Sequence, residues 1–411
     1  MKNWNSYTGF PPQLRDALGE AEFGASLPAI RGTWYFVDPY GSTLPLPNAP
    51  GQVVTTLRDA YDLCVTGKGD GICILSGGTS AAHTTSYLSY PLEWSKHAIT
   101  VIGLCSPTRM FQRARIANVE HTTGALTVLA FVQGSETTYD KITRTTGSFI
   151  TDGFVAGDII RVNTTGNGAN ATGLVIQTVE ALTLTLTTIG TLVTETAANA
   201  GSSVVNSYCP YMINVTGNNN TFINLNIGNW SSDAAALGGF IDAGARNTFI
   251  NTHFVGAGHA TPGAVATAFS FKMNGSQETT GYNCTFGTDS VLKAAANGEI
   301  VYENHVWRSR FYNCESLSYS ATAGKGAVNL SGATSCDGIQ LFKDCDFHNW
   351  NENGIDKSDA AVIGTNPTSG AIHLHNPGNV GFTANAKTGL TNVYVTGYVT
   401  ASAAGGIATT L

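Results

Sequence analysis

The sequence contains few charged residues. Only 12% of its 411 residues are Asp, Glu, Lys or Arg, about half the share found in average soluble domains. Such scarcity is found in membrane proteins and in some disordered chains. No window approaches the roughly 18 consecutive apolar residues of a spanning helix. Disorder combines low hydrophobicity with high net charge, whereas 42% of these residues are hydrophobic and the net charge is −7. We therefore expect a folded chain with no membrane partner.

Basic runs, paired cysteines and an N-terminal apolar segment are also missing. A net charge of −7 argues against a nucleic-acid partner, which would require a basic surface. The eight cysteines include no C-x-x-C pair, so we expect buried free thiols, no metal site and no cofactor. Residues 2–7 lack the apolar core of a signal peptide. We therefore expect the chain to be made and retained in a cytoplasm.

Repeats of about 30 residues are present in the second half of the chain. Each repeat has a short strand, then Asn or Asp, then a second short strand. The central residue steps by 27, 32, 30 and 31 positions through Asn224, Asn251, Asn283, Asn313 and Asp344. Asn and Asp tolerate the left-handed conformation of a sharp bend, so this column marks a corner. Strand pairs at this period, with no obvious helix between them, predict an all-β fold: a right-handed, single-stranded parallel β-helix.

Apolar residues keep a period of two on both sides of the corner, which predicts ladders of side chains in the core. Phenylalanine forms the ladder before the corner: Phe222, Phe249, Phe311 and Phe342. Two ladders follow the corner, one of small residues and one that is mostly aromatic: Leu225, Thr252, Cys284, Cys314 and Cys345, then Ile227, Phe254, Phe286, Ser316 and Phe347.

The first half of the chain supplies a cap and an insertion. Apolar residues at 57, 60, 61 and 64 predict an amphipathic helix, with Thr56 and Asp59 as a capping pair, which would cover the first coil. Residues 142–150, 158–162, 174–178 and 182–188 predict strands of a small antiparallel domain inserted into the solenoid. The expected segments are an arm (1–32), the β-helix start and cap (33–105), the inserted β-domain (106–206), the main β-helix (207–400) and a tail (401–411).

Two stretches resemble known families. Tyr35-Phe36-Val37-Asp38-Pro39, followed by the helix and by Gly69-Asp70-Gly71, resembles the opening of right-handed β-helix proteins of the pectate-lyase-like group, many of them phage-encoded. Residues 143–154, with Gly157-Asp158 and 182–186, resemble a small β-module of phage virion proteins. The resemblance implies a tailed-phage protein, commonly a homotrimer. It leaves open an inert capsid or tail protein, or a tailspike that cleaves surface polysaccharide.

Carboxylates decide between these two classes, because glycosidic hydrolysis needs two of them, about 5 to 9.5 Å apart. The candidates for such an enzyme are Glu315, Asp344 and Asp346, which occupy adjacent repeats. Glu315 and Asp346 share an outward column one coil apart, which would suit a retaining pair. The alternative is that Asp344 replaces Asn at a corner and the other two are solvated. His373 and His375 share a strand face without a third metal ligand in sight, so surface histidines are the simpler interpretation.

Three tryptophans are candidate binding residues. Trp230, Trp307 and Trp350 lie near the ends of repeat strands and would recur along one edge of the solenoid. They could stack on sugars, or pack between subunits, where Trp and Tyr are enriched.

The sequence favours a non-enzymatic structural protein of a tailed-phage virion, a homotrimeric capsid decoration protein, with no catalytic residue. Its partners would be itself and the major capsid protein or other virion proteins, contacted through the arm and the inserted domain. The alternative is a tail protein or tailspike that binds and cleaves host polysaccharide. The shortage of clustered acidic residues among the 28 present favours the structural protein.

Overall fold

The computed structural model describes residues 30–38, 52–75, 85–104, 114–124, 128–163, 167, 170–171, 173–196, 204–320, 322, 324–351, 354–355, 360–378, 380–381, 387 and 389–397. The expected tail and all but the last residues of the expected arm lie outside the described residues. The chain divides into two compact units. We call residues 1–87, 92–117 and 211–411 the solenoid unit, and residues 88–91 and 118–210 the inserted unit.

Three sheets form the wall of the solenoid unit. The twelve-stranded sheet follows the order β2 (Val53–Val54), β1 (Trp34–Val37), β3 (Gly71–Leu75), β6 (Thr100–Leu104), β15 (Thr221–Ile223), β18 (Thr248–Ile250), β21 (Thr280–Tyr282), β25 (Arg310–Tyr312), β28 (Cys336–Lys343), β32 (Ser369–His375) and β34 (Val393–Thr396), with β24 (Val306–Trp307) beside β28. The nine-stranded sheet contains β4 (Thr85–Leu88), β7 (Ala114–Asn118), β16 (Leu225–Asn229), β19 (His253–Ala257), β22 (Thr285–Gly287), β26 (Glu315–Tyr319), β29 (Asp346–Asn351), β30 (Gly354–Ile355) and β33 (Val380–Gly381). The seven-stranded sheet contains β5 (Leu92–Trp94), β14 (Ile213–Val215), β17 (Gly238–Asp242), β20 (Phe269–Asn274), β23 (Gly298–Glu303), β27 (Gly326–Leu330) and β31 (Val362–Gly364).

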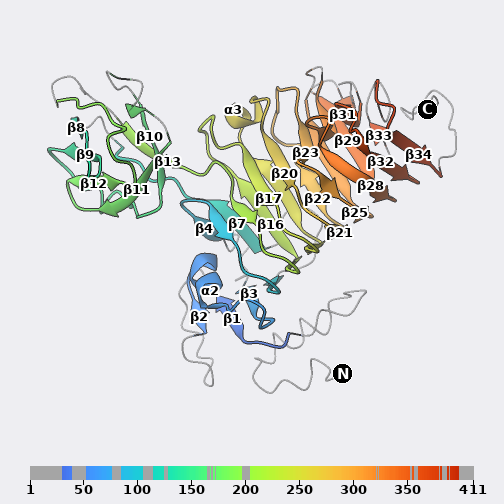
Figure 1. Cartoon of the computed structure of the whole chain (residues 1–411), viewed down its shortest axis with the longest axis horizontal. Coiled ribbons are helices and arrows are strands. Elements are labelled where there is room, and N and C mark those ends of the chain that lie inside the picture. Colours follow the sequence, from blue (N-terminus) through green and yellow to red (C-terminus); the bar gives the residue numbers. More distant parts are fainter. Residues whose placement is uncertain are drawn as a thin grey trace. The chain divides into compact units, whose positions relative to one another are not determined.

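From β5 to β33, each coil contributes a strand to each sheet. The coil β14, β15, β16 is followed by β17, β18, β19, and each strand pairs in parallel with its counterpart in the next coil. Figure 1 shows these coils following one another through the sequence colours from green to red. The expected parallel β-helix is therefore confirmed. It explains the low charge content, because like charges repeated in every coil would repel at the strand spacing of about 4.8 Å.

Aromatic ladders fill the core of the solenoid. The rings of Phe222 and Phe249 stack with centroids 5.3 Å apart, and those of Phe311 and Phe342 stack at 5.0 Å. The position between these pairs is Gly281, in register with Phe249 and Phe311. A Cβ atom there would lie 2.6 Å from the Phe311 ring, so this glycine makes room for the ring.

A column of thiols runs beside the corner. Cys284 N–H donates to Cys314 Sγ at 3.4 Å, and Cys314 N–H donates to Cys345 Sγ at 3.4 Å. Burial raises the pKa of the Cys314 thiol well above its ordinary value. The seven cysteines within the described residues are all buried and free, as expected; Cys105 lies outside them.

The predicted corner is a ladder of left-handed residues between the twelve-stranded and nine-stranded sheets. The backbone angle φ is positive at every step, from 48° to 56°, at Asn224, Asn251, Asn283, Asn313, Asp344 and Asn376. Their side chains also bond along the stack: Asn313 Nδ2 donates to Asn283 Oδ1 at 2.6 Å. The residue type is thus favoured both by the backbone conformation and by the side-chain ladder.

The described residues contain two short helices. Helix α2 (Leu57–Leu63) starts at Thr56, whose hydroxyl accepts from the Asp59 N–H at 3.1 Å, as the sequence predicts. Its Tyr61 ring lies 4.5 Å from Trp94, which in turn contacts Phe222 at 5.3 Å. The helix therefore caps the aromatic core. Helix α3 (Ala260–Gly263) lies between coils. Within the part of the chain described, no helix could cross a membrane.

The inserted unit is an antiparallel sheet with its own core. Its order is β13 (Val204–Tyr208), β10 (Ile159–Asn163), β11 (Leu174–Val179), β12 (Thr183–Leu186), β9 (Lys141–Arg144) and β8 (Leu129–Val132). The prediction that a strand continues to residue 150 is wrong. The chain turns at Gly147, where φ is 78°, and Phe149 enters the core from the turn that follows.

Candidate functional site

The carboxylates predicted as an enzyme site are only partly brought together. Glu315 opens β26 and Asp346 opens β29, and the two residues are in direct register on neighbouring strands. His348, two residues further along β29, places its Nε2 at 3.8 Å from Glu315 Oε1. The side chains of Glu315 and His348 are 23% and 21% exposed. We call Glu315, Asp346 and His348 the acidic ladder.

Asp344 does not join the acidic ladder. It occupies the corner, with φ at 54°, and its Oδ1 accepts from Asn376 Nδ2 at 2.6 Å. Lys343 Nζ lies 4.0 Å from its other oxygen. Asp344 therefore takes the place of an Asn in the corner ladder, which leaves one pair of carboxylates for chemistry.

Adjacent strands lie about 4.8 Å apart, so the register of Glu315 with Asp346 is compatible with the roughly 5 Å between the carboxyl groups of a retaining glycosidase. The three side chains of the acidic ladder are of metal-ligating types but are not placed as a metal site. Among the described residues no group of three or more His, Cys, Asp or Glu side chains is placed to hold a metal ion. His373 and His375 share one partner, the Thr396 hydroxyl, at 2.7 and 3.0 Å.

The three tryptophans do not all recur along one edge, so that prediction is wrong for Trp307. Trp230 follows β16 of the nine-stranded sheet, and the Arg115 guanidinium lies 4.6 Å from its ring centre. Trp307 lies in β24, beside the twelve-stranded sheet. The backbone of Trp350 lies in β29 in register with Tyr319, and its side chain is outside the description. The short strand β24 precedes β25 in its coil, so Trp307 lies on a different sheet from the strands that carry or precede Trp350 and Trp230.

Exposed aromatic and aliphatic side chains that the sequence did not predict lie on the outer side of the twelve-stranded sheet. The rings of Tyr282 and Tyr312 stack with centroids 5.2 Å apart, at an interplanar angle of 12°. Ile339, on β28, is 62% exposed and Tyr394, on β34, is 55% exposed. We call these residues the aromatic face, together with one exposed tryptophan: Tyr282, Trp307, Tyr312, Ile339 and Tyr394. The sequence held one signal of this face. Phe311 and Phe342 point inward, so the alternation of a strand places the residue after each of them on the outer side of the sheet.

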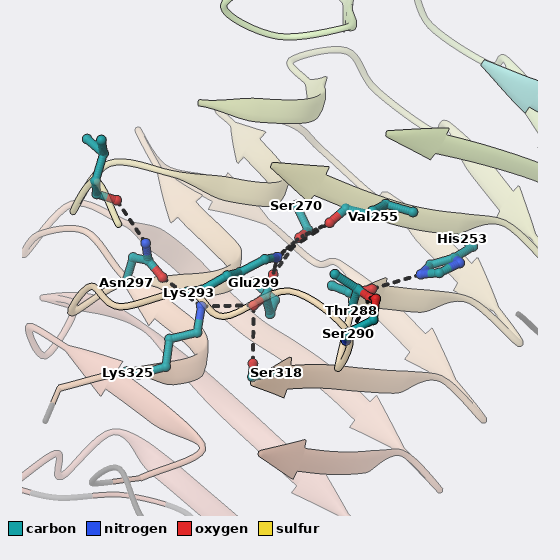
Figure 2. A network of polar contacts seen from close by, with 12 residues as sticks. His253, Val255, Ser270, Thr288, Ser290, Lys293, Asn297, Glu299, Ser318 and Lys325 are labelled. Carbon is teal, nitrogen blue, oxygen red and sulfur yellow. Dashed lines mark hydrogen bonds and ion pairs between the residues drawn. The ribbon is translucent and has the colours of Figure 1, made fainter. Parts of the chain in front are cut away.

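A second feature that sequence reasoning missed is a buried ionic network at the connection between the nine-stranded and seven-stranded sheets. Glu299, in β23, accepts Lys293 Nζ on Oε2 and Lys325 Nζ on Oε1, each at 2.8 Å. Figure 2 shows both lysine side chains reaching this carboxylate. Ser318 Oγ donates to Oε1 at 3.2 Å, and Ser270 also donates to the carboxylate. Both oxygens of the carboxylate therefore accept hydrogen bonds from buried donors.

Burial sets the electrostatics of this network. Burial opposes the ionisation of Glu299, but the two ammonium groups overcome this effect and hold its pKa at about 2. Burial lowers the pKa of Lys325 to about 8. Three charges, two positive and one negative, thus lie away from water. The signal available in the sequence was Glu299 itself, a carboxylate inside the strand run Gly298-Glu299-Ile300-Val301-Tyr302.

Comparison with known proteins finds no matching family model and no curated relative. Among solved structures, a pectin methylesterase in complex with a hexasaccharide aligns over 88% of this chain and 92% of its own, at 11% identity and a TM-score of 0.40. PemA, a pectin methylesterase of Erwinia chrysanthemi, aligns over 90% and 93%, at 11% identity and a TM-score of 0.39. The tailspike gp49 of Pseudomonas phage LKA1 aligns over 82% and 75%, at 12% identity and a TM-score of 0.19. Scores this low carry no functional argument, and the fold assignment rests on the strand register.

Proposed function

We propose that this chain is a non-enzymatic structural protein of a tailed-phage virion, a homotrimer that decorates the capsid. The aromatic face carries the proposal, as the surface through which copies of the chain associate. Ile339 is the most exposed large hydrophobic side chain among the described residues. Exposed apolar patches mark interaction surfaces, and an aliphatic side chain suits a protein partner better than a sugar.

The tyrosine pair supports the same partner. Tyr282 and Tyr312 stack on each other, so one face of each ring is already covered and less ring surface is left for a sugar. Lys343, on β28, is in register with Tyr312, and Arg310 lies two residues before Tyr312 on β25. Aromatic residues and Arg are enriched at protein interfaces. The arm and the inserted unit would then dock this chain on the major capsid protein.

Charge on the aromatic face should dissociate the oligomer. We expect the full chain to sediment as a trimer, and the variant Ile339→Asp/Tyr394→Asp to sediment as a monomer, because the carboxylates would be desolvated at the contact. Ile150→Asp is the matched control, since Ile150 is 59% exposed in the inserted unit, and it should stay trimeric. Analytical ultracentrifugation separates these outcomes. A monomeric wild-type chain at micromolar concentration contradicts the proposal.

The register of Glu315 and Asp346 favours a second candidate, a tailspike that cleaves polysaccharide. On this hypothesis Glu315→Gln lowers the release of reducing sugar from host capsule by at least about 100-fold, because an essential acid or nucleophile is lost. Glu303→Gln, which removes an exposed carboxylate 3.4 Å from Lys272, should leave release unchanged. Wild-type protein that releases no sugar contradicts this candidate. Release that depends on Glu315 contradicts the non-enzymatic proposal.

A further inference from the structure

A lysine, an asparagine and a glutamate meet in the buried ionic network. Lys325 Nζ donates to Asn297 Oδ1 at 2.6 Å and lies 2.8 Å from Glu299 Oε1. The amide nitrogen of Asn297 donates to the Val265 carbonyl at 2.9 Å. Each of the three side chains is 1% exposed. A primary amine is thus held against a carboxamide, with a carboxylate in hydrogen-bond contact (Figure 2). All three groups are shielded from water.

We propose that Lys325 and Asn297 form an intramolecular isopeptide bond, with Glu299 as the group that carries the proton. Lys325 Nζ gives a proton to Glu299 Oε1, and the neutral amine then attacks Asn297 Cγ. The Nζ–Cγ bond forms and the Cγ–Nδ2 bond breaks. The proton held by Glu299 goes to the departing nitrogen, which leaves as ammonia. The attacking nitrogen gives its second proton to Glu299, which passes it to the ammonia and is again a carboxylate, so that ammonium is released. An alkylammonium and a primary amide become a secondary amide and ammonium, so no oxidant or reductant is needed.

The geometry supplies two requirements of this amide transfer. The amine and the amide are already in contact, so the reaction is unimolecular and its orientational entropy has been lost during folding. Glu299 lies within hydrogen-bond distance of the nucleophile, which is the geometric requirement for a general base. Burial lowers the pKa of Lys325 to about 8, which favours formation of the reactive neutral amine at neutral pH.

Charge balance gives the reaction a direction. Before it, two ammonium groups share one buried carboxylate, so the site carries an uncompensated positive charge. After it, Lys325 is a neutral amide and Lys293 and Glu299 remain as a pair of opposite charges. An unpaired buried charge is costly, and the reaction removes it.

The same contacts choose Lys325 rather than Lys293. Lys293 Nζ bonds Glu299, the Ser270 hydroxyl and the Val255 carbonyl, none of which is a carboxamide. Asn297 immediately precedes β23 and Lys325 immediately precedes β27, and these strands pair in adjacent coils. The bond would therefore link two coils covalently.

Peptide mapping of the purified, folded chain tests the proposal. Trypsin should fail to cleave after Lys325, because the amine is acylated. We expect a branched product that joins residues 294–308 to residues 311–343, lighter than the sum of the two linear peptides by one ammonia. Separate peptides 294–308 and 311–325 in the folded wild-type chain would overturn the proposal.

Loss of ammonia alone does not support the isopeptide bond. Asn297 is followed by Gly298, and attack by the Gly298 nitrogen would form a succinimide that has lost the same mass. The succinimide leaves two linear peptides, so only the branched product, with fragment ions from both arms, supports the isopeptide bond. Ammonia loss confined to a linear 294–308 peptide contradicts it.

Two variants assign the roles. Lys325→Arg keeps the charge but removes the amine, and Glu299→Gln removes the base. Both should give no branched product, with folding checked by circular dichroism. Lys272→Arg, a lysine outside the network that lies near Glu303, should give as much branched product as the wild type. Full cross-linking in Glu299→Gln overturns the role of Glu299. If the network variants do not fold, the wild-type map still decides whether the bond exists.

Discussion

Glu299→Gln should lower the free energy of unfolding by about 3–5 kcal/mol, the range seen when one partner of a buried charge pair is removed. Glu299 is the shared counter-ion of Lys293 and Lys325, and all three side chains are at most 3% exposed. The variant leaves Lys293 buried without a negative partner whether or not Lys325 has been acylated. If the cross-link forms, its loss adds to the effect.

Urea unfolding at neutral pH measures this effect. The control is Glu303→Gln on the same strand, which removes an exposed carboxylate paired with Lys272, and should cost less than about 1 kcal/mol. The triple variant Lys293→Met/Glu299→Gln/Lys325→Met should recover much of the loss, because it removes all the buried charges. A triple variant that is no more stable than Glu299→Gln would contradict this prediction.

The solenoid could be predicted from the sequence because its rules are local. The positive φ of the corner favours Asn or Asp at each step, and alternation around it puts Phe222 and Phe249 in the core. The register of Glu315 with Asp346 follows from the same columns. Prediction failed outside the repeats. In the inserted unit the sequence pattern predicts a strand up to residue 150, but the strand ends at Arg144 and the chain turns.

The buried ionic network could not be predicted, because its members come from separate coils and irregular connections. Lys293 and Lys325 lie outside the strands, and nothing in their spacing shows that both reach Glu299. The same reason applies to Trp307, whose position depends on a short extra strand, β24, that the other repeats do not define. Sequence columns specify the coil, whereas the connections decide which side chains meet between coils.

A second buried carboxylate should make stability depend on pH. Asp242, in β17, is completely buried; its Oδ1 accepts from Asn247 Nδ2 at 2.7 Å and from the Gly244 N–H at 3.3 Å, and Thr279 donates to Oδ2. Burial raises its pKa from 3.8 to about 6, more than these hydrogen bonds lower it. The buried site therefore prefers the protonated carboxyl.

The sign follows from proton linkage. Because the pKa of Asp242 is higher in the folded chain than in the unfolded one, the folded chain binds the proton more tightly. The resulting stabilisation is fully present below pH 3.8 and is lost as pH rises through about 6. At 1.36 kcal/mol per pH unit, the contribution is about 3 kcal/mol. Other carboxylates titrate in the same range, so only the difference between wild type and a variant isolates Asp242.

Asp242→Asn should remove this dependence, because the amide keeps the shape and does not ionise. We expect its stability relative to wild type to rise by about 3 kcal/mol between about pH 4 and pH 7, measured by urea unfolding at each pH. Asp62→Asn, at an exposed position of helix α2, is the control and should keep a constant difference from wild type. A pH-independent difference for Asp242→Asn would mean that the buried carboxylate has the same proton affinity in the folded and unfolded chain, contrary to its complete burial in β17.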